Sequence, residues 1–316
     1  MSGPLSHIKV LDLSRVLAGP WCGQNLADLG ADVIKVERPG KGDDSRGYAP
    51  PYLKDEKGND TKEGAYFCAA NRGKRSITVN LSKPEGQQLV RELAQQCDVL
   101  IENYKVGDLA RYGLGYEDLK KLNPGLIYCS VTGFGQTGPY KDFKNEEIIT
   151  YALSGIMSIS GLAEREPLKH GGMQSQYEGG LAGAVGTLAA IHARDMLGEG
   201  QQVDISLQDV ITSTLVIHQP MYGWVGAVQG RRRPSGSNYG QVQECKDGYF
   251  IWQTGGGAEW SDIIEFFGSE QSKEERFATV AIANDCVAGL HGERAFGNAP
   301  PNAIYVTWST GIGDRK

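Results

Sequence analysis

Cysteine is scarce in this sequence, and long hydrophobic runs are missing. The six cysteines stand at positions 22, 68, 97, 129, 245 and 286, and no two have the CxxC spacing of a zinc site or a redox dithiol. The apolar surroundings of four of them predict small core residues in a reducing compartment. No apolar stretch reaches roughly 18 residues, so we expect no membrane span. No secretory signal is evident, and we expect the cytoplasm, with mitochondria or another organelle left open.

Positive charge is also in short supply. The chain has 32 Lys and Arg against 38 Asp and Glu, a net charge of -6. Nucleic acid is therefore not expected as a partner, because phosphate binding needs a basic surface. The basic run Arg231, Arg232 and Arg233 is interpreted as a solvated loop before a proline. None of the five histidines has a metal-like partner at short spacing, so no metal site is expected.

Common nucleotide and hydrolase signatures are missing too. The turn after the first expected strand reads VLAGPWCG over residues 16–23, where a dinucleotide-binding protein would have GxGxxG. Glu37 ends the second expected strand, where such a protein holds a ribose, so an NAD-dependent oxidoreductase stays a weak alternative. No phosphate loop and no GxSxG occur, which argues against ATP chemistry and a serine hydrolase. The helix start behind Gly19 still offers free backbone N–H groups to an anion.

What the sequence does contain is a series of short apolar segments that alternate with helical ones. We expect strands at 8–13, 31–36, 76–81, 98–102, 126–131 and 202–206. We expect helices at 19–29, 82–96, 146–159, 175–197 and 207–222. Ser82, Pro84 and Glu85 indicate a capping box at the start of the second helix. This alternation predicts an α/β fold with a doubly wound parallel sheet covered on both faces.

Other segments predict loops and a second domain. Residues 38–71 are rich in Gly, Pro, Asp and Lys and predict a long surface loop. The small residues of 179–186 indicate close helix packing, and Asp247-Gly248 predicts a hairpin. We expect a large domain over 1–224, the start of a smaller α+β domain over 225–268, and a divergent or truncated C-terminal segment over 269–316.

Five ordered runs carry a resemblance to a known family, and they extend over about residues 8–253. Together they resemble family III CoA-transferases of the formyl-CoA and carnitine CoA-transferase type, a family that also includes α-methylacyl-CoA racemases. The runs are LDLSRVLAGPWCGQNLADLGADVIKVERPGKGD (11–43), NRGKRSITVNLSKPEGQQLVREL (71–93), DVLIENYKVGDLARYGL (98–114), LNPGLIYCSVTGFGQTGPY (122–140) and ARDMLGEGQQVDISLQD (193–209).

The resemblance implies a Rossmann-like CoA-binding domain over 1–224, a smaller domain, and a homodimer of two interlocked, ring-shaped chains. It implies acyl-CoA and a carboxylic acid as substrates, and no prosthetic group. Arg38 and Arg111 would meet phosphates through charge-assisted hydrogen bonds; the alternative for both is a surface ion pair. The positions carried over to CoA binding are Arg15, Val16, Ala18, Arg38, Val79, Asn103, Tyr104 and Arg111.

The resemblance also implies a carboxylate nucleophile that forms an acyl anhydride and then an enzyme thioester with CoA. The family has Asp at the position that Glu164 occupies here, three residues after Gly161. Glu presents the same group one methylene farther out, and a misplacement of about 1 Å can cost roughly 100-fold in rate. Glu166 is the alternative nucleophile.

Further departures leave a second interpretation open. Arg15 and Leu17 replace a His and a Gln, Thr132 replaces a Lys, and a glycine-rich loop is only partly matched, by Gly236 and Gly240. The alternative to an active CoA-transferase is therefore a catalytically impaired CoA-binding paralogue or partner subunit. Racemase activity is not expected, because its His and Asp would fall near Glu146 and residues 175–176, where neither type occurs.

Overall fold

The computed structural model describes residues 3–231, 242–245, 248–251, 280–284 and 304–308. The chain divides into two compact units, residues 1–231 and 232–316. The predicted domain limits at 224 and 268 stay predictions. Within the described residues, no helix combines the length and the apolar character that a membrane crossing would need.

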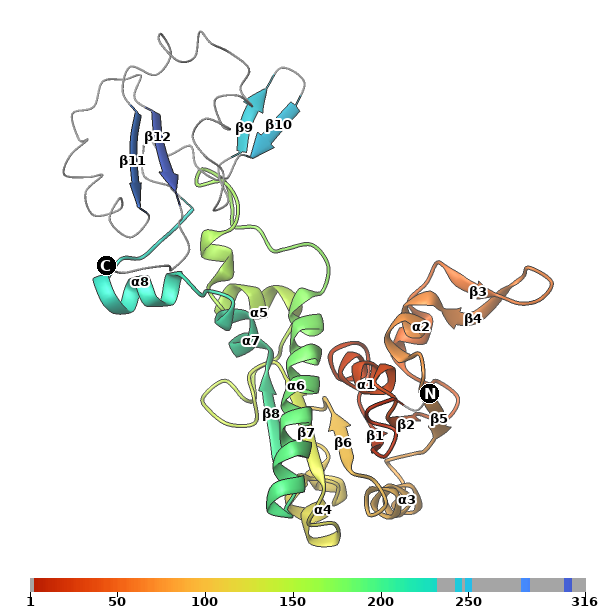
Figure 1. Cartoon of the computed structure of the whole chain (residues 1–316). Helices are drawn as coiled ribbons and strands as arrows, with labels where there is room; N and C mark the ends of the chain where they lie inside the picture. Colours follow the sequence, from red (N-terminus) through yellow and green to blue (C-terminus); the bar gives the residue numbers. More distant parts are fainter. Residues whose placement is uncertain (1–2, 232–241, 246–247, 252–279, 285–303, 309–316) are drawn as a thin grey trace. The chain divides into compact units, whose positions relative to one another are not determined.

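A parallel six-stranded sheet forms the centre of the first unit (Figure 1). Its strands lie in the order β5-β2-β1-β6-β7-β8, and every neighbouring pair is parallel. The chain first builds outward from β1 to β5 and then resumes on the other side of β1 with β6. In such sheets, ligands bind at the carboxyl ends of the strands where the order reverses. The strands are β1 (Lys9–Asp12), β2 (Asp32–Glu37), β5 (Arg75–Thr78), β6 (Val99–Glu102), β7 (Ile127–Thr132) and β8 (Gln202–Ser206).

Helices cover both faces of this sheet, which confirms the predicted α/β architecture with a parallel sheet. One core joins the strands to α1 (Ala18–Asp28) and α6 (Gln174–Leu197). The other core joins them to α3 (Pro84–Ala94) and α4 (Tyr116–Leu122). A Cβ on Gly180 would lie 2.5 Å from the carbonyl oxygen of Ala18. The small residues of α6 therefore let it approach α1 closely, as the sequence predicted.

The prediction of a plain surface loop over 38–71 is wrong from Asp44 onward. This segment contains a short 3-10 helix, a hairpin and a helix: η1 (Asp44–Gly47), β3 (Tyr52–Lys54), β4 (Asp60–Gly64) and α2 (Ala65–Asn71). Asp43 and Ser45 are buried in it. The side chain of Asp43 accepts the Ser45 N–H at 2.9 Å, which starts η1 and fixes the segment against the sheet.

The predicted capping box is also wrong. The first residue of α3 is Pro84, its N-cap is Lys83, and no side chain caps it. The N–H of Ser82 instead donates to the side chain of Asn80 at 3.0 Å.

Two predicted helices are interrupted. Residues 146–159 form α5 (Glu147–Leu153) and η3 (Ile156–Ile159), separated at Gly155, whose φ of 87° lies in the left-handed region. Residues 207–222 lie in α7 (Leu207–Ser213) and α8 (His218–Val225). The hydroxyls of Thr212, Ser213 and Thr214 donate to backbone carbonyls at the end of α7. Such bonds compete with helix continuation.

In the second unit, β9 (Val242–Cys245) pairs antiparallel with β10 (Gly248–Ile251). Cys245 pairs with Gly248 in this antiparallel ladder, as the predicted hairpin requires. A parallel pair, β11 (Val280–Asn284) with β12 (Ile304–Trp308), is also described. The glycine-rich loop predicted at Gly236 and Gly240 lies outside the described residues.

Candidate functional site

Two cavities lie where the strands of the sheet end. The first, of about 130 Å³, contains two arginines and is called the arginine cavity. The second, of about 580 Å³, contains three lysines and is called the lysine cavity. Tyr104 lines both, so the cavities are neighbours. The arginine cavity is lined by Arg15, Val36, Glu37, Arg38, Gly42, Asp43, Val79, Asn80, Leu81, Ser82, Tyr104 and Tyr112.

Many of the lining residues directly follow a strand, which explains why they meet. Arg38 follows β2, Val79 follows β5, and Asn103 and Tyr104 follow β6. Because the strands are parallel, their carboxyl ends share one edge of the sheet. The alternation of strands and helices in the sequence therefore brings these distant residues to one place.

The segment from β1 to α1 contributes Arg15 to the arginine cavity and Ala18 to the lysine cavity, and it is held by side chains on both sides. Asn103 accepts the Arg15 N–H at 2.8 Å and donates to the Arg15 carbonyl at 2.7 Å. Asp43 accepts the Val16 N–H, with its oxygens 3.2 and 3.3 Å away. Val16 has a φ of 68°, a left-handed conformation that a β-branched residue rarely adopts. Such strain costs about 1–3 kcal/mol, and the surrounding contacts must offset it.

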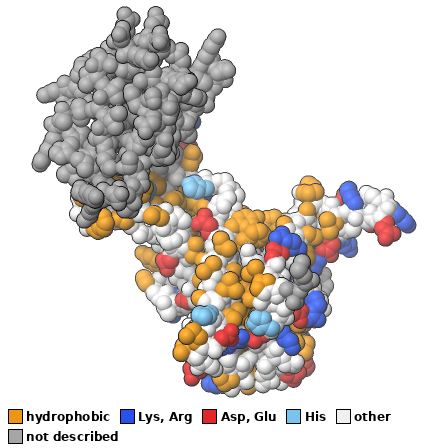
Figure 2. Space-filling view, viewed as in Figure 1, with side chains coloured by type: hydrophobic (Ala, Val, Ile, Leu, Met, Phe, Trp, Pro, Cys, Tyr) orange, Lys and Arg blue, Asp and Glu red, His pale blue; other side chains and the backbone are white. Residues whose placement is uncertain are grey.

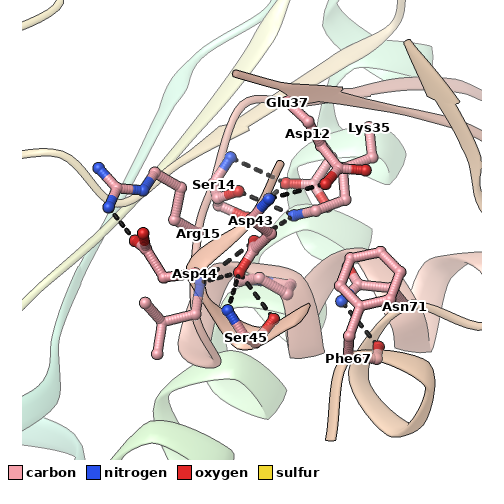
Figure 3. Close-up of polar contacts among 12 residues, drawn as sticks. Asp12, Ser14, Arg15, Lys35, Glu37, Asp43, Asp44, Ser45, Phe67 and Asn71 are labelled. Atoms are coloured by element: carbon pink, nitrogen blue, oxygen red, sulfur yellow. Dashed lines mark hydrogen bonds and ion pairs between the residues drawn. The ribbon is translucent and has the colours of Figure 1, made fainter. Parts of the chain in front are cut away.

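Asp43 is the centre of a buried charge network (Figure 3). Its carboxylate lies 2.9 Å from the Lys35 ammonium, and both side chains are 1% exposed. Glu37 accepts the Asp43 N–H at 2.7 Å. Burial alone would raise the pKa of Asp43, but the Lys35 charge and the hydrogen bonds from Ser45 hold it below its usual value. Asp43 is therefore an ionised anchor for the loop and for the segment that follows it.

A second buried pair fixes the start of the same loop. Lys74 donates to Asp12 at 2.8 Å, and their side chains are 2% and 0% exposed. Asp12 also accepts the Ser14 N–H at 2.9 Å. Burial would raise the pKa of Asp12, yet Lys74 and Lys35 lower it. Because Asp12 and Lys74 are buried and bonded to each other, they are not available to a ligand, and we assign them the role of shaping the loop.

The two arginines of the arginine cavity share one acidic partner, Asp44. Arg38 donates to its carboxylate at 2.6 Å, and Arg15 bonds to the other oxygen. Burial alone would lower the pKa of Arg15, but Asp44 raises it. The buried Nε of Arg15 has no hydrogen-bond partner among the described residues. The cavity thus combines positive charge with an unused donor.

The structure brings most of the predicted CoA-binding residues together and leaves two predicted site residues apart. Arg15, Arg38, Val79 and Tyr104 line the arginine cavity, and Ala18, Asn103 and Tyr104 line the lysine cavity. Val16 lies in the β1–α1 loop, next to Arg15, and lines neither cavity. Arg111 lies in η2 (Ala110–Tyr112), pairs with Asp108 and has a side chain that is 70% exposed. Glu164 is exposed in the loop between η3 and α6. Neither Arg111 nor Glu164 lines either cavity.

The sequence did not indicate how the first turn of α6 is held beside the lysine cavity. Gln176 in this turn lines the cavity. The neighbouring Ser175 donates its N–H and its hydroxyl to the buried carboxylate of Glu147, at 2.9 and 2.5 Å. Glu147 belongs to α5, so one helix supplies the acceptor that caps the other. No local pattern could reveal it, because 28 positions separate the two residues.

Glu102 is a further residue that the sequence did not single out. It ends β6, is buried, and accepts the Tyr104 N–H at 2.8 Å. Burial raises the pKa of Glu102 to about 7, although hydrogen bonds from Ser130 and Tyr104 oppose the shift. Its carboxyl group thereby fixes the backbone of the tyrosine that lines both cavities.

Comparison with known proteins agrees with this arrangement. The chain is 44% identical over 280 residues to succinate–glutarate CoA-transferase of Agrobacterium fabrum, covering 87% of this chain and 70% of that protein. It is 39% identical over 267 residues to succinyl-CoA:glutarate CoA-transferase of Mus musculus, covering 83% and 59%. The chain thus spans 59–70% of the length of these relatives. Both relatives are named as CoA-transferases that act between two acids, which is the reaction class predicted from the sequence.

Solved structures show the same fold. A CAIB/BAIF family protein from Brucella suis matches with a TM-score of 0.77 and 43% identity, over 88% of this chain and 74% of that one. The protein Rv3272 from Mycobacterium tuberculosis matches with a TM-score of 0.73 and 28% identity, over 87% and 72%. The sequence model of CoA-transferase family III matches residues 5–292. The predicted family is therefore confirmed: this chain belongs to CoA-transferase family III.

Proposed function

We propose that the chain is a CoA-transferase that moves CoA between carboxylic acids, and that its sheet is a Rossmann-like domain that holds the CoA. The observation that carries this proposal is the meeting of Arg15 and Arg38 in one cavity at the carboxyl ends of β1 and β2. The phosphates of CoA are the natural partners of two guanidinium groups in such a position, because arginine forms bidentate, charge-assisted bonds to them.

In this proposal CoA extends from the arginine cavity to the lysine cavity. Val79 and Tyr112 offer apolar surface to the adenine in the arginine cavity. Asn103 and Tyr104 guide the pantetheine arm along the β1–α1 loop toward the lysine cavity. Arg111 is kept as a proposed phosphate contact from the outside, where its exposed side chain is free to exchange Asp108 for a stronger anion.

We propose short dicarboxylic acids as the substrate class. The two relatives above are named for succinate or succinyl-CoA and glutarate. Lys105, Lys141 and Lys144 line the lysine cavity, and none has an ion-pair partner among the residues that the structure describes. Asp108, Asp142 and Glu146 line the same cavity, so the lysines act as individual donors and not as a net positive charge. One of them can pair with the second carboxylate of such an acid, while its first carboxylate reacts.

Glu164 is the proposed nucleophile, and Glu166 the alternative. The carboxylate attacks the thioester carbonyl, the carbon–sulfur bond breaks, CoA leaves as a thiolate, and an acyl–glutamyl anhydride remains. The thiolate then attacks the glutamyl carbonyl, which releases the first acid and leaves an enzyme–CoA thioester. The acceptor carboxylate attacks this thioester and forms a second anhydride, from which the thiolate takes the acyl group and frees the glutamate. Each step exchanges one nucleophile for another, so no further reactant is needed.

The loop that carries Glu164 is anchored mainly through its own backbone groups. Arg231 donates to the carbonyls of Leu162 and Arg165 at 3.0 and 3.3 Å, and Ser160 accepts the Leu168 N–H at 3.2 Å. For Glu164 to react in this scheme, the thioester must reach the loop between residues 160 and 173.

Mass spectrometry of the intact protein after incubation with succinyl-CoA tests the proposal. We expect the mass of a CoA thioester on Glu164 that hydroxylamine removes and borohydride reduces. Glu164→Gln should abolish the adduct and the exchange of CoA with glutarate, whereas the matched Glu166→Gln should keep both. Exchange that persists in Glu164→Gln would refute this nucleophile, and an adduct lost only in Glu166→Gln would move the role there.

The second candidate function is a catalytically impaired CoA-binding paralogue or partner subunit. Exposure of Glu164 outside both cavities favours it, as does Thr132 in place of the family's lysine, with a hydroxyl that has no partner within the described residues. Calorimetric binding of CoA without exchange against a panel of dicarboxylic acids would support it over the transferase.

We also propose a homodimer. Figure 2 shows hydrophobic side chains between the charged ones on the visible surface. On α6, Leu181 and Val185 are 52% and 59% exposed. Apolar side chains on a long helix favour burial against a partner chain. Light scattering across a dilution series tests this, with a monomer mass at all concentrations as the contrary result.

A further inference from the structure

We infer that Asp44 is a built-in competitor for the anionic end of CoA. It occupies both arginines of the arginine cavity until a phosphate replaces it. The inference rests on the proposed function, since it concerns how the same cavity selects its ligand.

The position of Asp44 is fixed by its neighbour. Asp43 is buried and bonded to Lys35, Val16 and Ser45, and Asp44 follows it as the first residue of η1. Figure 3 shows the Asp44 side chain turned toward Arg15. The backbone therefore presents this carboxylate to the arginines without freedom to move far away.

The pairing neutralises the charge of the arginines but binds them weakly. The side chains of Arg15, Arg38 and Asp44 are 36%, 45% and 34% exposed. Ion pairs this open to water contribute only about 0–1 kcal/mol each. A phosphate group has more negative charge and more acceptor oxygens than a carboxylate, so it can displace Asp44 from both guanidinium groups.

The arginine cavity offers an incoming anion no further basic side chain among the described residues. Arg15 and Arg38 are the only Lys or Arg side chains among the described residues that line the arginine cavity. An anion that enters the cavity must take these two from Asp44 or bind without them. The exchange disfavours carboxylate anions, such as the acid substrates, and permits a nucleotide that carries several phosphates. Asp44 is thus inferred to keep acids out of the nucleotide end of the site.

The test is calorimetric titration of CoA into the full-length wild type and three variants. Asp44→Asn removes the competing charge and should tighten CoA binding by about 5- to 10-fold, the gain from freeing two weak ion pairs. Asp44→Glu keeps a carboxylate and should stay within about 2-fold of wild type. Asp32→Asn removes the same charge from an exposed pair with Arg75, at the opposite end of β2. It controls for overall charge and should change the affinity by less than about 2-fold.

Two further probes separate competition from other effects. Pantetheine, which has no phosphate, should bind all four proteins equally. Added succinate should weaken CoA binding only in Asp44→Asn, because only there can a carboxylate reach the two arginines. Wild type that binds CoA no more weakly than Asp44→Asn would overturn the competitor role, and weaker binding by Asp44→Asn would show that Asp44 positions the arginines instead. No CoA binding by any of the four folded proteins would overturn the proposed function itself. Thermal unfolding of each variant checks that it is folded.

Discussion

The loop from β1 to α1 and the loop that carries Glu164 are built in opposite ways. The first is fixed by buried charges, by Asn103 on one side and by Asp43 on the other. The second is exposed and is held by a few backbone contacts and by Arg231. The proposed CoA-binding half of the site is thus preformed, while the proposed nucleophile lies where little structure restrains it. The first loop supports the proposed CoA binding, whereas the exposed position of Glu164 in the second loop is the main argument against the proposed nucleophile.

Among the substitutions that test this difference between the loops, removal of the Asp43 carboxylate should cause the largest loss in the free energy of unfolding. Asp43→Ala leaves the buried Lys35 ammonium without its acidic partner and should lower the free energy of unfolding by about 3–5 kcal/mol. Denaturant titration measures this change. Asp60→Ala breaks an exposed pair with Lys54 and should cost less than about 1 kcal/mol. Equal losses in the two variants would mean that the buried network is not what fixes the first loop.

Glu102 makes the same region sensitive to pH. Its pKa is raised by burial to about 7 in the folded protein, against 4.5 as the ordinary value. The protonated form therefore stabilises the fold at low pH, and this contribution is lost as the pH rises from about 4.5 through about 7. Glu102→Gln keeps the neutral form and should be more stable than wild type by about 3 kcal/mol at pH 8, but nearly equal at pH 4.

Denaturant titrations of both proteins at the two pH values check this prediction. Glu92→Gln on the exposed surface of α3 is the matched control. A difference between wild type and Glu102→Gln that does not grow with pH would contradict the raised pKa.

Loss of the Glu147 carboxylate should have a smaller effect. Glu147→Ala removes the acceptor of two hydrogen bonds at the start of α6, and helix caps of this kind contribute about 0.5–2 kcal/mol. Hydrogen exchange should report faster opening of the first turn of α6, which contains Gln176. Glu146→Ala, one residue earlier and exposed, should leave that turn protected.

The smallest effect on stability is expected in the second loop. Glu164→Gln should change the free energy of unfolding by less than about 0.5 kcal/mol, because the side chain is exposed and has no resolved partner in the described residues. Thermal unfolding measures this. A loss above about 1 kcal/mol would indicate that Glu164 has a structural role.

Much of the first unit could be predicted from the sequence, because buried parallel strands are short apolar runs and their order limits the topology. All six strands of the sheet were predicted within a few residues, and the small residues of α6 were correctly linked to helix packing. The breaks at Gly155 and after Ser213 were missed, since a helical pattern of apolar residues continues across both. The structured part of 38–71 was missed because its order comes from the distant partners of Asp43.

The sequence by itself determined the family and predicted a set of CoA-binding residues, because each of these residues belongs to an ordered run of the signature. It also determined that Arg38, Val79 and Tyr104 follow strand ends. Only the tertiary structure decided that Asp44 joins Arg15 to Arg38, that Asp43 and Asn103 hold Val16 from two sides, and that Glu164 stays outside the cavities. Contacts between side chains far apart in the chain depend on how strands and helices pack, and no local pattern of residues records them.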